Sequence, residues 1–448
     1  MTKDLTHGKP LKVLIGFAIP VFLGSLFQQF YNMVDSAIVG RFVNTQALAG
    51  VGATGSINFM IMGFVLGMCT GFAVPIAQCF GAGDEDGVKR FFVNSIWISI
   101  VLSAVVTVFT LIFIDDILRL MKTPDDIFDY AKTYISTIFA GTAGMCAYNL
   151  LASVLRALGD SKTPVAFLIF ASILNLILDL IFVLVFHMGV QGTSLATVLS
   201  QTISAILCAL LIVKRYPILH PTRRMLKPEG SRIKKMCSIG IPMGLQFSIT
   251  AIGSVCISAA INTLGSVYVA AITAGSKIHM LFAIALDSIG MTMATYTGQN
   301  VGAGHYKRIK QGIWTLVIAG TVYCLVVCVI QFFFGRTFAL IFVSKDNTEI
   351  INCIYTFLIY NTLAYFFLSP LHITRNTIQG AGFSFLAMFA GVFEMVARCF
   401  VAFGLVGRFG YNAACLANPV AWLMADIFLI PACIYVMKRL KVMLPEKE

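Results

Sequence analysis

The sequence predicts an all-α polytopic membrane protein. Hydrophobic residues make up 58% of the 448 residues and charged residues only 12%, and the mean hydropathy is +0.88. A soluble protein of this length carries about twice that share of charge. Apolar runs of about twenty residues or more, long enough to cross a bilayer as a helix, recur from end to end. Little of the chain is left for a soluble domain.

The apolar runs predict twelve transmembrane helices, each with boundaries uncertain by about 2–4 residues. In chain order they cover residues 12–38, 49–79, 89–115, 128–156, 163–186, 190–213, 236–263, 267–298, 309–335, 350–376, 383–407 and 411–437. Gly and Pro are frequent in the second and eighth spans, which membrane helices tolerate where their neighbours satisfy the backbone. The stretch before the first span is short, polar and basic, so we expect that span to be retained and not cleaved as a signal.

The net charge of +12 is unevenly distributed between the loops. Basic residues concentrate at both ends and in the loops that follow even-numbered spans: Lys3, Lys9, Lys12, Lys89, Arg90, Arg156, Lys162, Lys307, Arg308, Lys310, Lys438, Arg439 and Lys441. The loop after the third span is acidic. By the positive-inside rule, both termini are expected in the cytoplasm of a multi-pass protein of the cell (plasma or inner) membrane. Membrane lipids are the expected surroundings of these basic loops, and nucleic acid is not an expected partner.

The longest polar stretch predicts a division into two lobes. It is basic, contains Pro217, Pro221 and Pro228, and separates six spans from six. The predicted parts are an N-terminal six-helix lobe, a basic cytoplasmic linker and a C-terminal six-helix lobe, at residues 1–213, 214–235 and 236–448.

Short matches between the two lobes indicate an internal repeat. Pro20 in the first span corresponds to Pro242 in the seventh, and the turn Gln78–Gly83 corresponds to Gln299–Gly304. Because each lobe has an even number of spans, the repeats are parallel. Two parallel six-helix bundles around a central cleft are typical of a transporter that opens alternately to the two sides of the membrane.

Polar residues inside the first lobe predict an ion site. Asp35 lies roughly 5–8 Å inside the outer end of its span, and Asp179 and Thr197 lie roughly 10 Å inside theirs, at about 1.5 Å per residue. Asn175 is one turn from Asp179 and shares its face. Such oxygen ligands suit a hard cation such as Na+, and the paired carboxylates equally suit a shared proton. The remaining alternative is that these residues only bind helices together.

Other intramembrane polar residues predict a substrate cavity or structural contacts. Candidates for the cavity are Gln28, Asn32, Gln246 and Asp287. Asp287, like Asp426, can instead pair locally with a neighbouring helix. Glu394 and Arg398 are one turn apart and can neutralise each other, so we interpret them as a structural pair.

Several classes of function have no support in the sequence. The 12 cysteines are scattered, with no metal-binding spacing. There is no phosphate-binding loop, zinc-helix motif or nucleophile elbow. We therefore expect neither an enzyme nor a cofactor other than a coupling ion.

The chain resembles the multidrug and toxic compound extrusion (MATE) transporters over nearly its whole length, and among them the DinF-like branch. The resemblance lies in the two Gln-x-x-Gly-Ala-Gly turns, in Tyr31–Asp35, in Leu155–Asp160 and in Glu394-x-x-x-Arg398. It implies a coupling-ion site at the first-span Asp, the fifth-span Asn-x-x-x-Asp and the sixth-span Thr, positions held here by Asp35, Asn175, Asp179 and Thr197. A NorM-like acidic residue in the seventh span is missing, and Gln246 is the strongly polar residue there.

The resemblance implies a secondary active antiporter. Because two fused halves already supply a full pathway, we expect the protein to work as a monomer. It would export small organic cations or amphipathic drugs and toxins in exchange for Na+ or H+ by alternating access. Neutralisation of Asp35 and Asp179 would let the first helix repack, with a bend near Pro20 or Gly24. The alternatives are a lipid-linked precursor flippase of the same broad superfamily and a major-facilitator transporter. The first cytoplasmic loop lacks the core of the major-facilitator signature.

Overall fold

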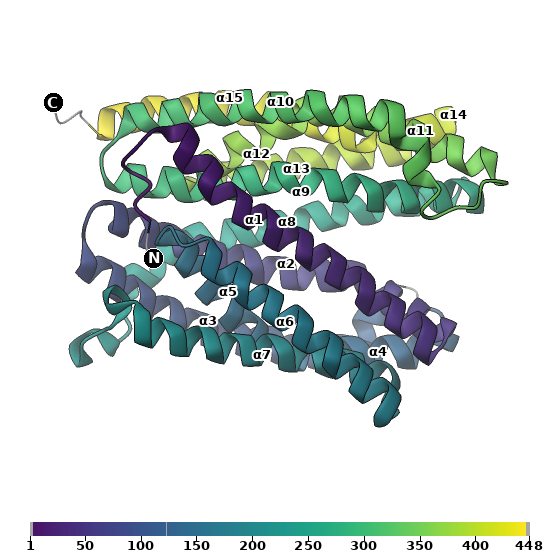
Figure 1. Cartoon of the computed structure of the whole chain (residues 1–448), viewed down its shortest axis with the longest axis horizontal. Coiled ribbons are helices and arrows are strands. Elements are labelled where there is room, and N and C mark those ends of the chain that lie inside the picture. Colours follow the sequence, from purple (N-terminus) through teal and green to yellow (C-terminus); the bar gives the residue numbers. More distant parts are fainter. Residues whose placement is uncertain (1–2, 122, 445–448) are drawn as a thin grey trace. The chain divides into compact units, whose positions relative to one another are not determined.

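The computed structural model describes residues 3–121 and 123–444, and every regular element in them is a helix (Figure 1). The first half contains α1 (Pro10–Ile38), η1 (Val39–Val43), α2 (Thr45–Gly81), α3 (Glu85–Leu120), α4 (Asp125–Ala140), α5 (Thr142–Ala157), α6 (Lys162–Leu180), η2 (Ile181–Val185) and α7 (Gly189–Arg215). Two short 3₁₀ helices follow, η3 (Pro217–Leu219) and η4 (Arg223–Leu226). The second half contains α8 (Gly230–Asn262), α9 (Ser266–Gly302), α10 (Tyr306–Ala339), α11 (Thr348–Leu363), α12 (Tyr365–Gly380), α13 (Ser384–Phe400), η5 (Val401–Leu405), α14 (Val406–Cys415) and α15 (Ala417–Met443).

The helices confirm the predicted polytopic membrane fold. Among the described residues, ten helices are long and apolar enough to cross a bilayer, and the number is twelve if each of two bent helix pairs counts as one span. The pair α4–α5 bends by 52° and the pair α11–α12 by 47°, at corresponding places in the two halves. A side chain at Gly141, in the first bend, would meet Val198 Cγ2 on α7 at 2.2 Å. Close packing of α7 into this bend therefore requires glycine.

The predicted start of the last span at residue 411 is wrong, although the predicted gap at residues 408–410 contains a break in the helix. Helical structure continues from α13 through η5 and α14 to Cys415, and α15 begins at Ala417 and not at residue 411. The interruption is at Gly410, whose φ of 59° and ψ of −137° are not helical. Glycine adopts a positive φ without steric cost, and the break lies between the polar residues Arg408 and Asn412.

The chain divides into two compact units. The first unit comprises Met1–Asp4 and Leu23–Gly244, and the second comprises Leu5–Phe22 and Leu245–Glu448. The predicted linker residues belong to the first unit, whereas the first half of α1 belongs to the second.

The change from one unit to the other occurs at equivalent positions in α1 and α8. In each helix it lies two residues after a proline, Pro20 in α1 and Pro242 in α8. Proline lacks the amide hydrogen for the helical hydrogen bond and its ring crowds the preceding turn. Both helices therefore have a weakened backbone near the place where their packing partners change.

In the first unit, α2 and the start of α8 approach each other at glycine. A Cβ on Gly67 would lie 2.6 Å from the Met243 carbonyl oxygen, and one on Gly71 would lie 2.5 Å from Gly240 Cα. Small residues at such crossings let membrane helices pack backbone to backbone.

We predict that Gly71→Ala destabilises the protein and Gly55→Ala does not. The Gly71 change forces α2 and α8 apart at a backbone contact, with an expected loss of about 1–3 kcal/mol. Gly55 lies on the same helix with no neighbouring atom within 4 Å, so alanine there should be neutral or stabilising by up to about 1 kcal/mol. Thermal unfolding of the two purified variants in detergent measures the difference. Equal midpoints would contradict this account of the crossing.

The segment before α8 is attached to α3. The indole Nε1 of Trp97 donates to the Leu226 carbonyl at 3.0 Å. Glu229 accepts from Arg90 Nη1 and from Arg232 Nε, each at 2.6 Å. The two arginines, Arg232 first, hold the pKa of the Glu229 carboxyl below its usual range.

This lowered pKa predicts a pH-dependent contribution to stability. The contribution is present above the unfolded-state pKa, about 4.3, and is lost as pH falls through the lower folded-state pKa. Glu229→Gln should lower the free energy of unfolding by roughly 0.5–1 kcal/mol at neutral pH, and the gap from wild type should close in acid. Glu85→Gln is the control, because the Glu85 side chain is 67% exposed and 3.7 Å from Lys89. Stability curves against pH test this, and a gap that widens in acid would refute it.

Candidate functional site

The first unit brings the predicted coupling residues together. Asp35 comes from α1, Asn175 and Asp179 from α6, and Thr197 from α7. Asp35 is 8% exposed, and Asn175 and Asp179 are each 1% exposed. The two carboxylates lie within electrostatic range of each other. We refer to these four residues as the carboxylate site.

Local backbone structure places the two carboxylates beside α7. Asp35 is followed by the π-helical turn η1 and Asp179 by η2. Both π-helical segments contact α7 and each other. A side chain at Gly192 of α7 would meet Phe182 Cβ of η2 at 3.0 Å, so this contact is close. Wide π turns are frequently found at functional sites because they redirect side chains within a continuous helix.

Thr197 is the centre of the hydrogen-bond network. Its hydroxyl donates to the Thr193 carbonyl at 3.1 Å and accepts from Asn175 Nδ2 at 3.2 Å. Tyr31 OH lies 3.1 Å from the same oxygen. Either hydroxyl can be the donor in that contact. The Thr197 hydroxyl thus contacts groups from α1, α6 and its own helix, and it positions Asn175 and Tyr31 beside the carboxylates.

Oxygens without partners remain at the site. Asp35 Oδ1, Asn175 Oδ1 and both carboxylate oxygens of Asp179 are buried without a hydrogen-bond partner among the described residues. Buried polar atoms are nearly always partnered in folded proteins. Four such acceptors from three residues form an arrangement that a proton or a hard cation would stabilise. The site contains no His or Cys ligand, so it is unsuited to a transition metal.

Two tyrosines at this site were not among the predicted site residues. Tyr31 and Tyr134, the latter on α4, both lie within electrostatic range of Asp35 and Asp179. Tyr134 is 9% exposed. Tyr31 could have been found from its place one turn before Asp35 on the same helix. The contribution of Tyr134 depends on the packing of α4, and nothing in its local sequence distinguishes it.

The remaining candidates are dispersed. Gln28 and Asn32 are exposed on α1. In the second unit, Gln246 is buried and accepts from Gln379 Nε2 at 2.7 Å. Asp287 on α9 is exposed, with its Oδ1 3.6 Å from His372 Nδ1. These residues remain predictions for the substrate cavity.

Glu394 and Arg398 do not form an isolated pair, because a third residue also binds Glu394. The two do approach, at 3.4 Å, but Arg375 of α12 also donates to Glu394. The carboxylate is therefore shared between two guanidinium groups and not neutralised within one helix.

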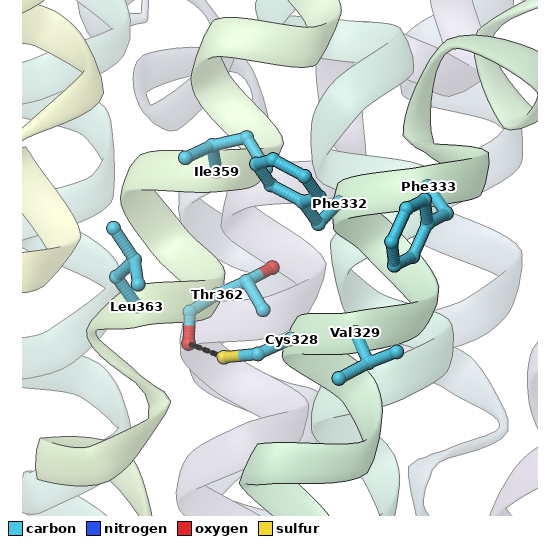
Figure 2. A pocket seen from close by; sticks show the side chains of 7 residues that line it. All are labelled: Cys328, Val329, Phe332, Phe333, Ile359, Thr362 and Leu363. Atoms are coloured by element: carbon cyan, nitrogen blue, oxygen red, sulfur yellow. Dashed lines mark hydrogen bonds between the residues drawn. The ribbon is translucent and has the colours of Figure 1, made fainter.

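A surface groove lies between α10 and α11, apart from all of these residues. It has a volume of about 340 Å³ and is lined by Cys328, Val329, Phe332, Phe333, Ile359, Thr362 and Leu363 (Figure 2). The two polar groups are turned into the helices, since Cys328 Sγ donates to the Thr362 carbonyl at 3.6 Å and the Thr362 hydroxyl donates to Gln331. The groove therefore offers an apolar surface and no charged group.

Known proteins resemble this chain over most of its length. The family model described as MatE matches residues 20–181 and 242–403, one match in each half. The probable multidrug resistance protein YpnP of Bacillus subtilis (strain 168) is 29% identical over 344 residues, which cover 77% of each chain. The DNA damage-inducible protein F of Escherichia coli (strain K12) is 24% identical over 65% of this chain and 64% of that protein. A solved structure described as MATE in complex with MaL6 has a TM-score of 0.91 and 23% identity, covering 99% of this chain and 100% of the other.

The two family matches begin at the two prolines of the repeat and confirm the duplication inferred from short motifs. Members of this family are transporters and not enzymes. The fold, the repeat and the family model agree, and the chain belongs to the MatE family of membrane transporters.

Proposed function

We propose that the protein is an ion-coupled antiporter that exports cationic or amphipathic organic compounds in exchange for Na+ or H+. The observation that supports ion coupling is the carboxylate site. It has two neighbouring buried carboxylates, and four of its oxygens have no hydrogen-bond partner among the described residues. Family membership supports efflux transport, and the similarity to a probable multidrug resistance protein supports drugs or toxins as cargo.

The coupling step follows from the electrostatics of the site. Empty and ionised, Asp35 and Asp179 repel each other in a medium of low dielectric constant. A proton or Na+ removes that repulsion and satisfies the free oxygens. Binding therefore favours closer approach of α1 and α6, and release favours their separation. An exporter needs this difference between two states, because a ligand shifts a conformational equilibrium only by its unequal affinity for them.

The first helix is suited to transmit the change. Asp35 and Tyr31 lie in its second half, and Pro20 lies just before the residues at which α1 passes from the second unit to the first. A side chain at Gly24 would meet Val165 Cγ2 of α6 at 2.7 Å, so α1 and α6 are in close contact there. We propose that α1 bends or repacks near Pro20 and Gly24 when the site is neutralised.

The setting of the transporter is part of the same proposal. Both termini face the cytoplasm, the membrane is the plasma or inner membrane, and one chain provides the complete pathway. The distribution of basic loops supports this orientation. No cofactor besides the coupling ion is proposed.

Asp35→Asn should abolish ion-driven export. The amide keeps the shape of the side chain but cannot be neutralised by a cation. Purified protein in vesicles would be assayed for efflux of a fluorescent organic cation under separately imposed Na+ and H+ gradients, which also identifies the coupling ion. Asp129→Asn is the control, because Asp129 is an exposed carboxylate of the same unit. Undiminished coupled efflux in Asp35→Asn would overturn the proposal, and lipid scrambling without dye efflux would favour a flippase.

Thr197→Val should weaken ion coupling without abolishing the fold. Valine keeps the volume but leaves Asn175 and Tyr31 without their common partner. The loss of about 1.4 kcal/mol, typical of one or two buried hydrogen bonds, corresponds to roughly a tenfold lower apparent ion affinity. Thr202→Val on the same helix is the control, because the Thr202 hydroxyl donates only to the Val198 carbonyl of its own helix. Equal ion dependence of efflux in both variants would show that Thr197 does not organise the site.

A further inference from the structure

The second unit contains a buried charged cluster that the proposed coupling step does not use. Its members are Arg375 on α12, Glu394 and Arg398 on α13, and Asp426 on α15. Their exposed fractions are 8%, 3%, 6% and 4%. We refer to these four residues as the arginine cluster. Charged residues inside a membrane protein are costly, and they normally mark a functional site or pair completely.

Pairing within the arginine cluster is incomplete. Arg375 Nη2 donates to Glu394 Oε1, and Arg398 Nη2 lies 3.4 Å from Glu394 Oε2. One carboxylate thus serves two guanidinium groups, each of which carries five N–H donors. Arg375 Nε and Arg398 Nη1 remain buried without an acceptor among the described residues.

Asp426 does not supply the missing acceptor. It lies within electrostatic range of Arg375 and Glu394. However, its Oδ1 is itself buried without a partner in the described part of the chain. The cluster therefore has a balanced formal charge and unused hydrogen-bond donors on both arginines. A buried charged cluster with a purely structural role is expected to satisfy its hydrogen-bond donors.

The arginine cluster lies next to an exposed carboxylate. Asp287 of α9 has a side chain that is 55% exposed, and its Oδ1 is 3.6 Å from Nδ1 of His372. His372 precedes Arg375 by one turn on α12. Both Asp287 and His372 are within electrostatic range of Arg375. A side chain at Gly290 would meet Asn376 Nδ2 at 2.6 Å, so α9 and α12 are closely packed here. An accessible acid and buried guanidinium donors are thus neighbours in one unit.

We infer that the second unit binds the acidic group of an amphipathic cargo through Arg375 and Arg398, with the cargo's cationic end at Asp287. Guanidinium groups bind carboxylates through parallel hydrogen bonds, which provide geometric specificity as well as charge. The inference rests on the proposed export of organic cations and narrows it to molecules that also carry an acid. It assigns ion coupling to the first unit and cargo recognition to the second.

Equilibrium binding of two matched dyes tests the inference. The probes are a rhodamine with a free carboxylic acid and the methyl ester of the same rhodamine, both measured by fluorescence anisotropy with the purified full-length protein. Wild-type protein should bind the acid about tenfold more tightly than the ester, because only the acid can accept from the arginines. Equal affinity for the two dyes would overturn the inference while leaving the export of cations intact. If neither dye binds, the proposed cargo class fails as well.

A charge-balanced variant tests the residues. Arg398→Gln combined with Glu394→Gln removes one cation and one anion, so the sum of charges in the cluster is unchanged. The preference for the acid should fall to less than about threefold, and the affinity for the ester should stay the same, which also shows that the variant is folded. Arg336→Gln on α10 is the control, since Arg336 is exposed and stacks on Tyr355 at 5.0 Å.

If the double variant binds neither dye, Arg375→Lys provides the second test. Lysine keeps the positive charge but lacks the parallel N–H donors of the guanidinium group. The preference for the acid should therefore be reduced while the ester still binds. A full preference for the acid in either variant would contradict the inference. A preference that changes with pH but not with these substitutions would also contradict it, because groups outside the arginine cluster would then distinguish the acid from the ester.

Discussion

The burial of two neighbouring carboxylates in the first unit is the constraint on which the functional part of this structure depends. Asp35 and Asp179 lie in membrane-spanning helices, are nearly inaccessible, and have oxygens that no described group satisfies. Water cannot screen their repulsion there, so the unit is more stable when a cation or proton is present. Tyr31, Asn175 and Thr197 hold the helices in register around this charge through contacts centred on the Thr197 hydroxyl. In the proposed mechanism, coupling follows from this electrostatic cost, which a cation or a proton relieves.

The repeated scaffold carries different chemistry in its two halves. The bent helix pairs, the two prolines and the π-helical segments η2 and η5 recur at equivalent positions. The first unit places acids and hydroxyls beside its π-helical segments, whereas the second places two arginines around one glutamate. Duplication explains the similar architecture. Divergence of a few buried side chains accounts for the different roles that we propose for the two units.

Much of the fold could be predicted from the sequence because hydropathy directly reports the length of a membrane helix. The twelve spans follow from this pattern and the internal repeat from short matching motifs. The grouping of Asp35 with Asp179 followed from their similar depth. The break at Gly410 lies in the predicted gap at residues 408–410, but the hydropathy pattern did not indicate that helical structure resumes after it and continues to Cys415.

Side-chain partners were the least predictable part. Tyr134 comes within electrostatic range of Asp35 and Asp179 because α4 packs against α2 and α7. Arg375 reaches Glu394 from another helix. The spacing of Glu394 and Arg398 suggested a complete pair within one helix, so nothing in the sequence indicated Arg375 as a third partner. Likewise the sequence indicates that Thr197 belongs to the site, but its contacts with Asn175 and Tyr31 depend on how three helices pack together.

Infrared difference spectroscopy on the purified protein would test the central claim most directly. Addition of the coupling ion, Na+ or H+, should change the carboxyl absorption of wild-type protein, and the change should be absent when Asp35 and Asp179 are both replaced by asparagine. If the same carboxyl signal persists in that double variant, ion binding occurs elsewhere and the assigned role of the carboxylate site is wrong.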